Sequence, residues 1–165
     1  MIKHIPQNKR IYVDETGVET VLYRRFAWAF RGKKVYQKIT GKPFLRTSII
    51  AGLRNNGLMA TMEYRGYCNT EVILSWVEQV LVPELEVGDV VIWDNASFHK
   101  SPKIKALIEE AGCELLFLPP YSPDLNPIEH FWAVLKWHLT TLVQGGMFLQ
   151  EAISHYFQTT LPSVG

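Results

Sequence analysis

Three acidic residues lie at positions from which their side chains could come together in a catalytic site. Asp14 follows the run RIYV, Asp94 follows the apolar run VVIW, and Glu129 comes just after Pro127. The two runs predict strands, the first ending at Asp14, and proline is favoured at the first position of a helix. Functional groups gather at the carboxyl ends of strands in α/β sheets. If the two strands are neighbours, the two aspartates lie side by side and the helix brings Glu129 over them.

Three carboxylates in one pocket repel one another strongly unless a cation lies between them. A site made only of oxygen donors suits Mg²⁺, or Mn²⁺ in its place, better than Zn²⁺. Two such ions about 3.5–4 Å apart can activate a water or a hydroxyl and stabilise the leaving oxygen of a phosphodiester. Asp14, Asp94 and Glu129 therefore form a candidate two-metal centre.

Each acid also has a purely local explanation. Asn126 and Glu129 have the spacing of a capping box, in which Glu129 bonds back to the start of its own helix. Asp94 and Asn95 could form a turn after a strand, and Asp14 could pair with a nearby base. The residues alone leave the metal site and these local roles open.

The elements that must position these acids follow from the hydrophobic pattern. Strands are predicted at 10–14, 44–55, 58–66, 90–93 and 113–120, with a turn at 55–57 and an irregular basic hairpin at 21–37. Helices are predicted at 72–81, where Asn69 or Thr70 is the cap, and at 104–111, 127–142 and 147–158. This order predicts an α/β fold whose five-stranded mixed sheet has three antiparallel and then two parallel strands, with helices on both faces.

Composition narrows the class of protein. At 165 residues and 47% hydrophobic content, the chain suits a single domain over 1–165 with one sizeable core. Cys68 and Cys113 cannot build a disulfide framework, which favours a reduced, intracellular protein. No stretch approaches the roughly 20 apolar residues of a membrane span, so no membrane partner is expected.

Charge is distributed unevenly along the chain. Residues 1–60 carry twelve Lys and Arg against three Asp and Glu, a net charge of +9, and residues 61–165 carry a net charge of −8. A basic segment suits a polyanionic partner such as nucleic acid. The alternative is a solvated basic hairpin surface.

Three segments resemble a known family. YVDET (12–16), VIWDNASFHKS (91–101) and LPPYSPDLNPIEHFWAVLK (118–136) resemble the DDE transposases of the mariner superfamily, in particular its bacterial insertion-sequence-630 branch. Asp94 and Glu129 enclose 34 residues, the spacing typical of that superfamily. The resemblance extends over essentially the whole chain and implies a ribonuclease-H-like fold in which Asp14, Asp94 and Glu129 are catalytic residues and metal ligands.

The resemblance also implies an activity and partners. Relatives are Mg²⁺-dependent polynucleotidyl transferases that hydrolyse phosphodiesters at transposon ends and then join the freed 3′-hydroxyl to target DNA, usually at TA. Double-stranded DNA is the expected partner, and a homodimer on paired ends is the expected assembly. The bacterial cytoplasm, at the nucleoid, is the expected location.

Residues around the acids carry further expectations. Asn95 could steady Asp94 or a phosphate, or simply form a turn. His99 matches a histidine of the family motif and could contact DNA or orient a water, or simply begin a helix. Glu15 should point away from Asp14 by strand alternation.

Other side chains are expected to contact DNA or to support the fold. The residues expected to bind DNA are Arg24, Arg25, Arg31, Lys33, Lys34 and Lys100. Trp28 belongs to the same basic hairpin, which could instead be an exposed loop. Asp124 is expected to shape its loop, and Tyr121 and Trp132 are expected to be packing residues.

Relatives carry helix-turn-helix domains before the catalytic domain. Only thirteen residues precede Asp14, so we expect that module to be absent here; a separate N-terminal polypeptide could supply it. The chain would then be a split-frame product, a truncated copy or a shortened version. Two alternatives to a transposase stay open: a nuclease without strand transfer, and a silent DNA-binding or regulatory remnant.

Overall fold

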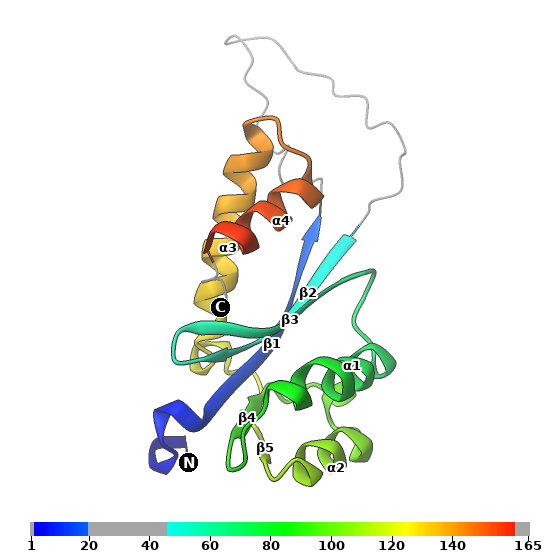
Figure 1. Cartoon of the computed structure of the whole chain (residues 1–165), viewed down its shortest axis with the longest axis vertical. Helices are drawn as coiled ribbons and strands as arrows, with labels where there is room; N and C mark the ends of the chain where they lie inside the picture. Colours follow the sequence, from blue (N-terminus) through cyan, green and yellow to red (C-terminus); the bar gives the residue numbers. More distant parts are fainter. Residues whose placement is uncertain (1, 20–45, 161–165) are drawn as a thin grey trace.

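The computed structural model describes residues 2–19 and 46–160, which are arranged around one sheet (Figure 1). The strands of this part are β1 (Arg10–Glu19), β2 (Arg46–Arg54), β3 (Gly57–Arg65), β4 (Val90–Trp93) and β5 (Glu114–Phe117). Their spatial order is β3-β2-β1-β4-β5, with β1, β2 and β3 antiparallel and with β4 and β5 parallel to β1. The predicted mixed sheet is confirmed, although β5 is an edge strand that is only partly buried.

Helices follow the strands much as the hydrophobic spacing predicts. The four α-helices of the described part are α1 (Thr70–Trp76), α2 (Pro102–Glu110), α3 (Ile128–Gln144) and α4 (Leu149–Thr160). Shorter turns are η1 (Ile2–His4), η2 (Gln7–Lys9), the π-helical η4 (Val77–Leu81), η5 (Val82–Glu84), η6 (Ser97–His99) and η7 (Pro123–Leu125). Asn69 caps α1, because its Oδ1 accepts the Val72 N–H at 2.9 Å. None of the helices within 2–19 and 46–160 has the length and apolar content needed to cross a membrane.

Alternation along β1 divides the core between the two faces of the sheet. Ile11 and Val13 pack in one cluster with Trp76 of α1 and Ile104 of α2. Val18 packs on the opposite side in a cluster with residues of α3 and α4. Helices therefore cover both faces, as predicted, and α1 and α2 lie apart from α3 and α4 in Figure 1. Because side chains alternate, Asp14 belongs to the α3 side and Glu15 to the α1 side.

The first strand does not end at Asp14, so that part of the prediction is wrong. β1 continues to Glu19, and the pairing of Asp14 with Ala51 extends to Glu19 with Arg46. The segment 15–19 contains a glycine and two glutamates, which favour a strand weakly by themselves. Antiparallel pairing with the long strand β2 overrides that weak preference. The basic hairpin predicted at 21–37, with its Arg24, Arg25, Arg31, Lys33 and Lys34, lies outside the described residues.

A buried carboxylate connects the residues at the start of β4 with the residue before β1 and with the end of β2. Asp89 is fully buried, forms an ion pair with Arg54 at the end of β2, and lies 3.4 Å from Lys9 Nζ. Asp89 Oδ2 also accepts the Glu86 N–H at 2.7 Å. These contacts join three segments at the point where β4 enters the sheet, and β4 in turn positions Asp94 at its other end.

We expect Asp89→Ala to lower the free energy of unfolding by about 1.5–3 kcal/mol, because it removes hydrogen bonds to a buried charge while Arg54 and Lys9 keep their pairs with Glu86. Urea unfolding followed by circular dichroism measures the change. Lys105→Ala is the control, since it breaks only the exposed pair with Glu109 and should cost no more than about 0.5 kcal/mol. A cost below about 1 kcal/mol for Asp89→Ala would contradict a fixing role.

Candidate functional site

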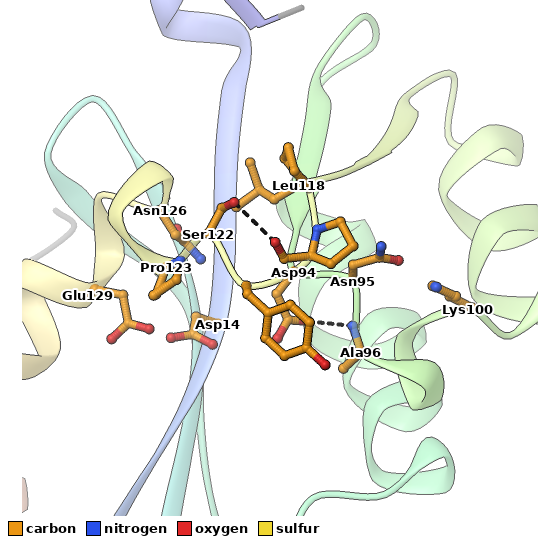
Figure 2. A pocket seen from close by; sticks show the side chains of 13 residues that line it. Asp14, Asp94, Asn95, Ala96, Lys100, Leu118, Ser122, Pro123, Asn126 and Glu129 are labelled. Atoms are coloured by element: carbon orange, nitrogen blue, oxygen red, sulfur yellow. Dashed lines mark hydrogen bonds between the residues drawn. The ribbon is translucent and has the colours of Figure 1, made fainter.

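A cavity of about 660 Å³ lies where β4 ends beside the middle of β1 (Figure 2). Its walls also come from the loop after β4 and from the loop that leads from β5 into α3. The lining residues are Asp14, Asp94, Asn95, Ala96, Lys100, Leu118, Pro119, Pro120, Tyr121, Ser122, Pro123, Asn126 and Glu129. Three segments that are distant in the sequence thus bring the three predicted acids, with Asn95 and Lys100, to one cavity.

The two aspartates lie level with each other because β1 and β4 are parallel. The register pairs Tyr12 with Ile92, so Asp14 reaches the level of Asp94, one residue after the end of β4. Asp14 itself stays within β1 and pairs with Ala51 of β2. One aspartate is therefore held in mid-strand, and the other stands where its strand leaves the sheet.

Trp132 of α3 fixes the orientation of the Asp14 carboxylate. Its indole Nε1–H donates to Asp14 Oδ2 at 3.0 Å. Its ring is 2% exposed and packs with Ile128 and Leu135 under the sheet. The prediction of a packing residue is therefore right but incomplete, because the same side chain also hydrogen-bonds to the acid.

Glu129 lies in the first turn of α3 and does not form a capping box with Asn126. Asn126 instead donates its side-chain Nδ2–H to the Val13 carbonyl at 3.2 Å, and its main-chain N–H to the Pro123 carbonyl at 3.0 Å. The Glu129 N–H donates to the main-chain oxygen of Asn126 at 3.1 Å. The exposed Glu129 carboxylate is left at the cavity, and α3 is fastened to β1 beside Asp14.

Asp94 is held by a buried histidine that also binds Glu15. His99 Nδ1 lies 2.5 Å from Asp94 Oδ1, and His99 Nε2 lies 2.6 Å from Glu15 Oε1. The Ala96 N–H also donates to Asp94 Oδ1, at 3.1 Å, as Figure 2 shows. Asp94 Oδ1 is therefore occupied, while the side chain remains half-exposed at the cavity.

Aromatic rings enclose the histidine. His99 has no exposed surface, stacks on Trp93 with a centroid distance of 4.4 Å, and has the edge of Phe98 at 4.3 Å. From the sequence, His99 is expected to contact DNA, to orient a water, or to begin a helix without a chemical role. In the structure it connects Asp94 to Glu15 on the opposite side of β1. This connection is possible because β4 ends at Trp93 and leaves room beside β1.

Burial and neighbouring groups shift the pKa values of the two aspartates and of His99 differently. Burial, with the nearby Glu15, Glu129 and Asp94, raises the pKa of Asp14 to about 8. Burial alone would raise the pKa of Asp94, but hydrogen bonds from His99 and Ala96 outweigh it and lower that pKa. Burial alone would also lower the pKa of His99, but its bonds to Asp94 and Glu15 raise it to about 9. His99 is therefore a cation near neutral pH and neutralises Asp94, whereas Asp14 has no such partner among the described residues.

The donor set suits a hard cation, although the side chains are not gathered around one. Within 2–19 and 46–160, no three His, Cys, Asp or Glu side chains are arranged so that they could hold a metal ion. Asp14, Asp94 and Glu129 nevertheless line one cavity and offer only oxygen. The Asp14 carboxyl, which has no cationic partner among the described residues, is the group whose ionised form a divalent cation would stabilise.

Tyr121 departs from its prediction as a packing residue. Its side chain is fully exposed at the rim of the cavity, and its backbone is left-handed, with φ of 56°. This conformation is uncommon and costly for a residue with a bulky side chain. Asp124, in η7, is exposed and does not line the cavity, and its expected part in shaping the loop stays a prediction.

Glu15 is the residue whose part in the site could not be derived from the sequence. Strand alternation correctly turns it away from Asp14, but 84 positions separate it from His99. Cys68 Sγ lies 3.6 Å from the same Glu15 oxygen, and burial raises the pKa of that thiol to about 12. Cys68 is therefore an un-ionised neighbour of Glu15 near neutral pH.

Comparison with known proteins agrees with this architecture. A curated relative, an uncharacterized protein (y4pE/y4sA) of Sinorhizobium fredii, is 35% identical over 74 residues, which are 42% of this chain and 50% of the relative. The Mos1 strand transfer complex aligns with a TM-score of 0.60 at 15% identity, covering 91% of this chain and 52% of that chain. The catalytic core domain of BIV integrase aligns with a TM-score of 0.54 at 13% identity, covering 96% and 88%.

The chain thus spans about half the length of the first relative and of the Mos1 chain. The structural matches, at such low identity, establish the fold, which is that of ribonuclease-H-like catalytic cores. The family model for the DDE superfamily endonuclease matches residues 9–144, which include every element from β1 to α3. This chain therefore belongs to the DDE superfamily endonucleases.

Proposed function

We propose that this chain is the catalytic domain of a DNA transposase of the mariner superfamily, of the insertion-sequence-630 branch. One observation carries the proposal: β1, the end of β4 and the start of α3 bring Asp14, Asp94 and Glu129 to one cavity, where Asp14 lacks a neutralising partner from the described residues. In this proposal Asp14, Asp94 and Glu129 are the catalytic metal ligands. The branch, the strand-transfer step and the preference for TA are proposed from the motif resemblance.

The side chains of this site fit two divalent ions, Mg²⁺ in the cell. Trp132 holds Asp14 Oδ2, and His99 with Ala96 holds Asp94 Oδ1, so each aspartate presents its other oxygen in a fixed direction. The Glu129 carboxylate, which lines the cavity, has no hydrogen bond from the described residues and is free to turn toward a cation. Bound metal would supply an activated nucleophile and would stabilise charge on the leaving oxygen.

Substrate DNA would approach the open side of the cavity. The exposed Lys100 lines one wall and offers a cation to a phosphate, and Tyr121 offers an exposed ring at the rim. The Mos1 strand transfer complex supports DNA as the partner. We also propose contacts from Arg24, Arg25, Arg31, Lys33 and Lys34, a homodimer on paired transposon ends, end recognition by a separate N-terminal polypeptide, and a bacterial, nucleoid-associated location.

A second candidate is a catalytically silent remnant that binds DNA or regulates a complete enzyme. Its support is that no three His, Cys, Asp or Glu side chains in 2–19 and 46–160 are arranged to hold a metal. A metal-dependent nuclease without strand transfer is the third possibility. A test of metal binding distinguishes the remnant from both enzymes. A test of 3′-end joining distinguishes the transposase from the nuclease.

Asp94→Asn tests the proposed reaction, because it removes a charge with little change of shape. We expect nicking of supercoiled plasmid, and joining of a pre-cut 3′-hydroxyl duplex to plasmid, to fall by about 10³-fold or more, since metal ions contribute several kcal/mol. Gel analysis in Mg²⁺ and in Mn²⁺ measures both reactions. Asp124→Asn, the same exchange on the neighbouring loop, should leave them unchanged. Undiminished cleavage by Asp94→Asn would remove Asp94 from the site.

Asp14→Asn tests the electrostatic state of the site. The pKa of Asp14 is about 8 in the fold against an ordinary 3.8, so the folded state keeps a proton that the unfolded chain has lost. Wild-type stability should therefore fall as pH rises from about 4 to about 8. In EDTA at pH 7.5, Asp14→Asn should therefore be more stable than the wild type, by up to about 5 kcal/mol, and should have a higher Tm.

Differential scanning fluorimetry in EDTA and in Mn²⁺ measures both parts of this expectation. Mn²⁺ should raise the Tm of the wild type and should have little effect on Asp14→Asn. Asp124→Asn again serves as the control, with a wild-type response to metal. A lower Tm for Asp14→Asn in EDTA would mean that the carboxylate already has a cationic partner.

Tyr121→Ala tests the rim of the cavity. Stacking of an unpaired base on an exposed aromatic ring is worth about 1–3 kcal/mol, so loss of the ring should weaken binding of a duplex with a 3′ overhang by about 5–100-fold. Tyr121→Phe should retain the affinity. Fluorescence anisotropy at low salt measures binding. Tyr67→Ala, which removes an exposed ring remote from the cavity, is the control, and an equal loss there would contradict a specific contact.

A further inference from the structure

Asn126 carries an unexplained polar atom at the candidate site. Its side chain is 4% exposed and lines the cavity (Figure 2). Its Nδ2–H donates to the Val13 carbonyl, as described above. Its Oδ1 is buried and has no hydrogen-bond partner among the described residues. Buried acceptors of this kind are uncommon in proteins and each calls for an explanation.

The tether to Val13 fixes this oxygen relative to the acids. Val13 directly precedes Asp14, and the main-chain oxygen of Asn126 accepts the Glu129 N–H. Asn126 is thus tied through the backbone to the segments that carry two of the three carboxylates. If its only purpose were to fasten α3 to β1, the donor Nδ2 would be sufficient, and the acceptor would be buried at a cost without compensation.

An amide oxygen is a hard, neutral donor of the type that divalent cations accept together with carboxylates. The site has three carboxylates, so a neutral ligand adds a donor without adding to their mutual repulsion. A fourth acid at this position would increase that repulsion. An amide is therefore the side chain best suited to a fourth oxygen beside Asp14.

We propose that Asn126 Oδ1 is a fourth ligand of the metal centre, a neutral oxygen that binds the cation held at Asp14. The inference rests on the proposed function, since it requires a divalent metal in this cavity. It goes beyond the carboxylate triad by assigning two roles to Asn126, which lies two residues before α3. The Nδ2 atom positions the helix, and the Oδ1 atom binds the cation.

A crystal of this chain soaked in Mn²⁺ and read by anomalous scattering tests the assignment directly. We expect the ion between Asp14, Asp94 and Glu129, with Asn126 Oδ1 within about 2.3 Å of it. Mn²⁺ at the three acids with Oδ1 outside coordination distance, bonded instead to a water, would overturn this inference and leave the proposed function intact. Absence of Mn²⁺ from the acids would overturn both.

Calorimetric titration of Mn²⁺ into the same protein supplies a second readout. Asn126→Leu, close in size and without polar atoms, should weaken Mn²⁺ binding by about tenfold or more. Ser122→Ala is the matched control, because Ser122 lines the same cavity but its hydroxyl already bonds the Pro120 carbonyl. Unaltered Mn²⁺ affinity with a lowered Tm in EDTA would reduce Asn126 to a tether. If Asn126→Leu fails to fold, the coordination seen in the soaked wild-type crystal decides.

Discussion

Parallel pairing of β4 with β1 is the constraint on which the site depends. The pairing is short, with Arg10, Ile11 and Tyr12 opposite Val90, Val91 and Ile92, and β4 then leaves the sheet while β1 continues. This difference in strand length creates the opening in which Asp94 can turn toward Asp14. It also gives His99 space to pass beside β1 and reach Glu15. A register shifted by one residue would move Asp14 to the other face, because side chains alternate along a strand.

The carboxylates that line the cavity lie close together, which lowers the stability of the fold but creates a site that could bind a cation. Among the described residues, the protonated His99 is a cation for Asp94, whereas Asp14 receives only the neutral indole of Trp132. Asp14 therefore bears most of the electrostatic cost, which is visible in its raised pKa. Binding sites commonly retain such strain because a ligand relieves it. A cation bound between the carboxylates would convert the cost into affinity.

The attachment of α3 connects packing with the same chemistry. The helix is held against β1 by its apolar face, through Ile128, Trp132 and Leu135. Its first turn is held by the polar contact of Asn126 with the Val13 carbonyl. These two attachments fix the position of Glu129 while leaving its carboxylate free. The helix start is thus more than a cap, since the residues that anchor it also supply or orient oxygen donors at the cavity.

Residue type and spacing were sufficient for the order of elements, the mixed sheet, the Asn69 cap and the approximate bounds of α2, α3 and α4, because each rests on local propensity or periodicity. They also singled out Asp94 and Glu129, since the end of β4 and the start of α3 are recognisable from the chain itself, whereas Asp14 was selected on a strand end that the structure places at Glu19. The extent of β1 beyond Asp14 could not be predicted, because pairing with β2 decides it. The role of Glu15, the hydrogen bond of Trp132 to Asp14, the exposure of Tyr121 and the orphaned oxygen of Asn126 were also decided only by tertiary structure. Each depends on which distant segment lies opposite a side chain. No local pattern in a single sequence specifies which segment that is.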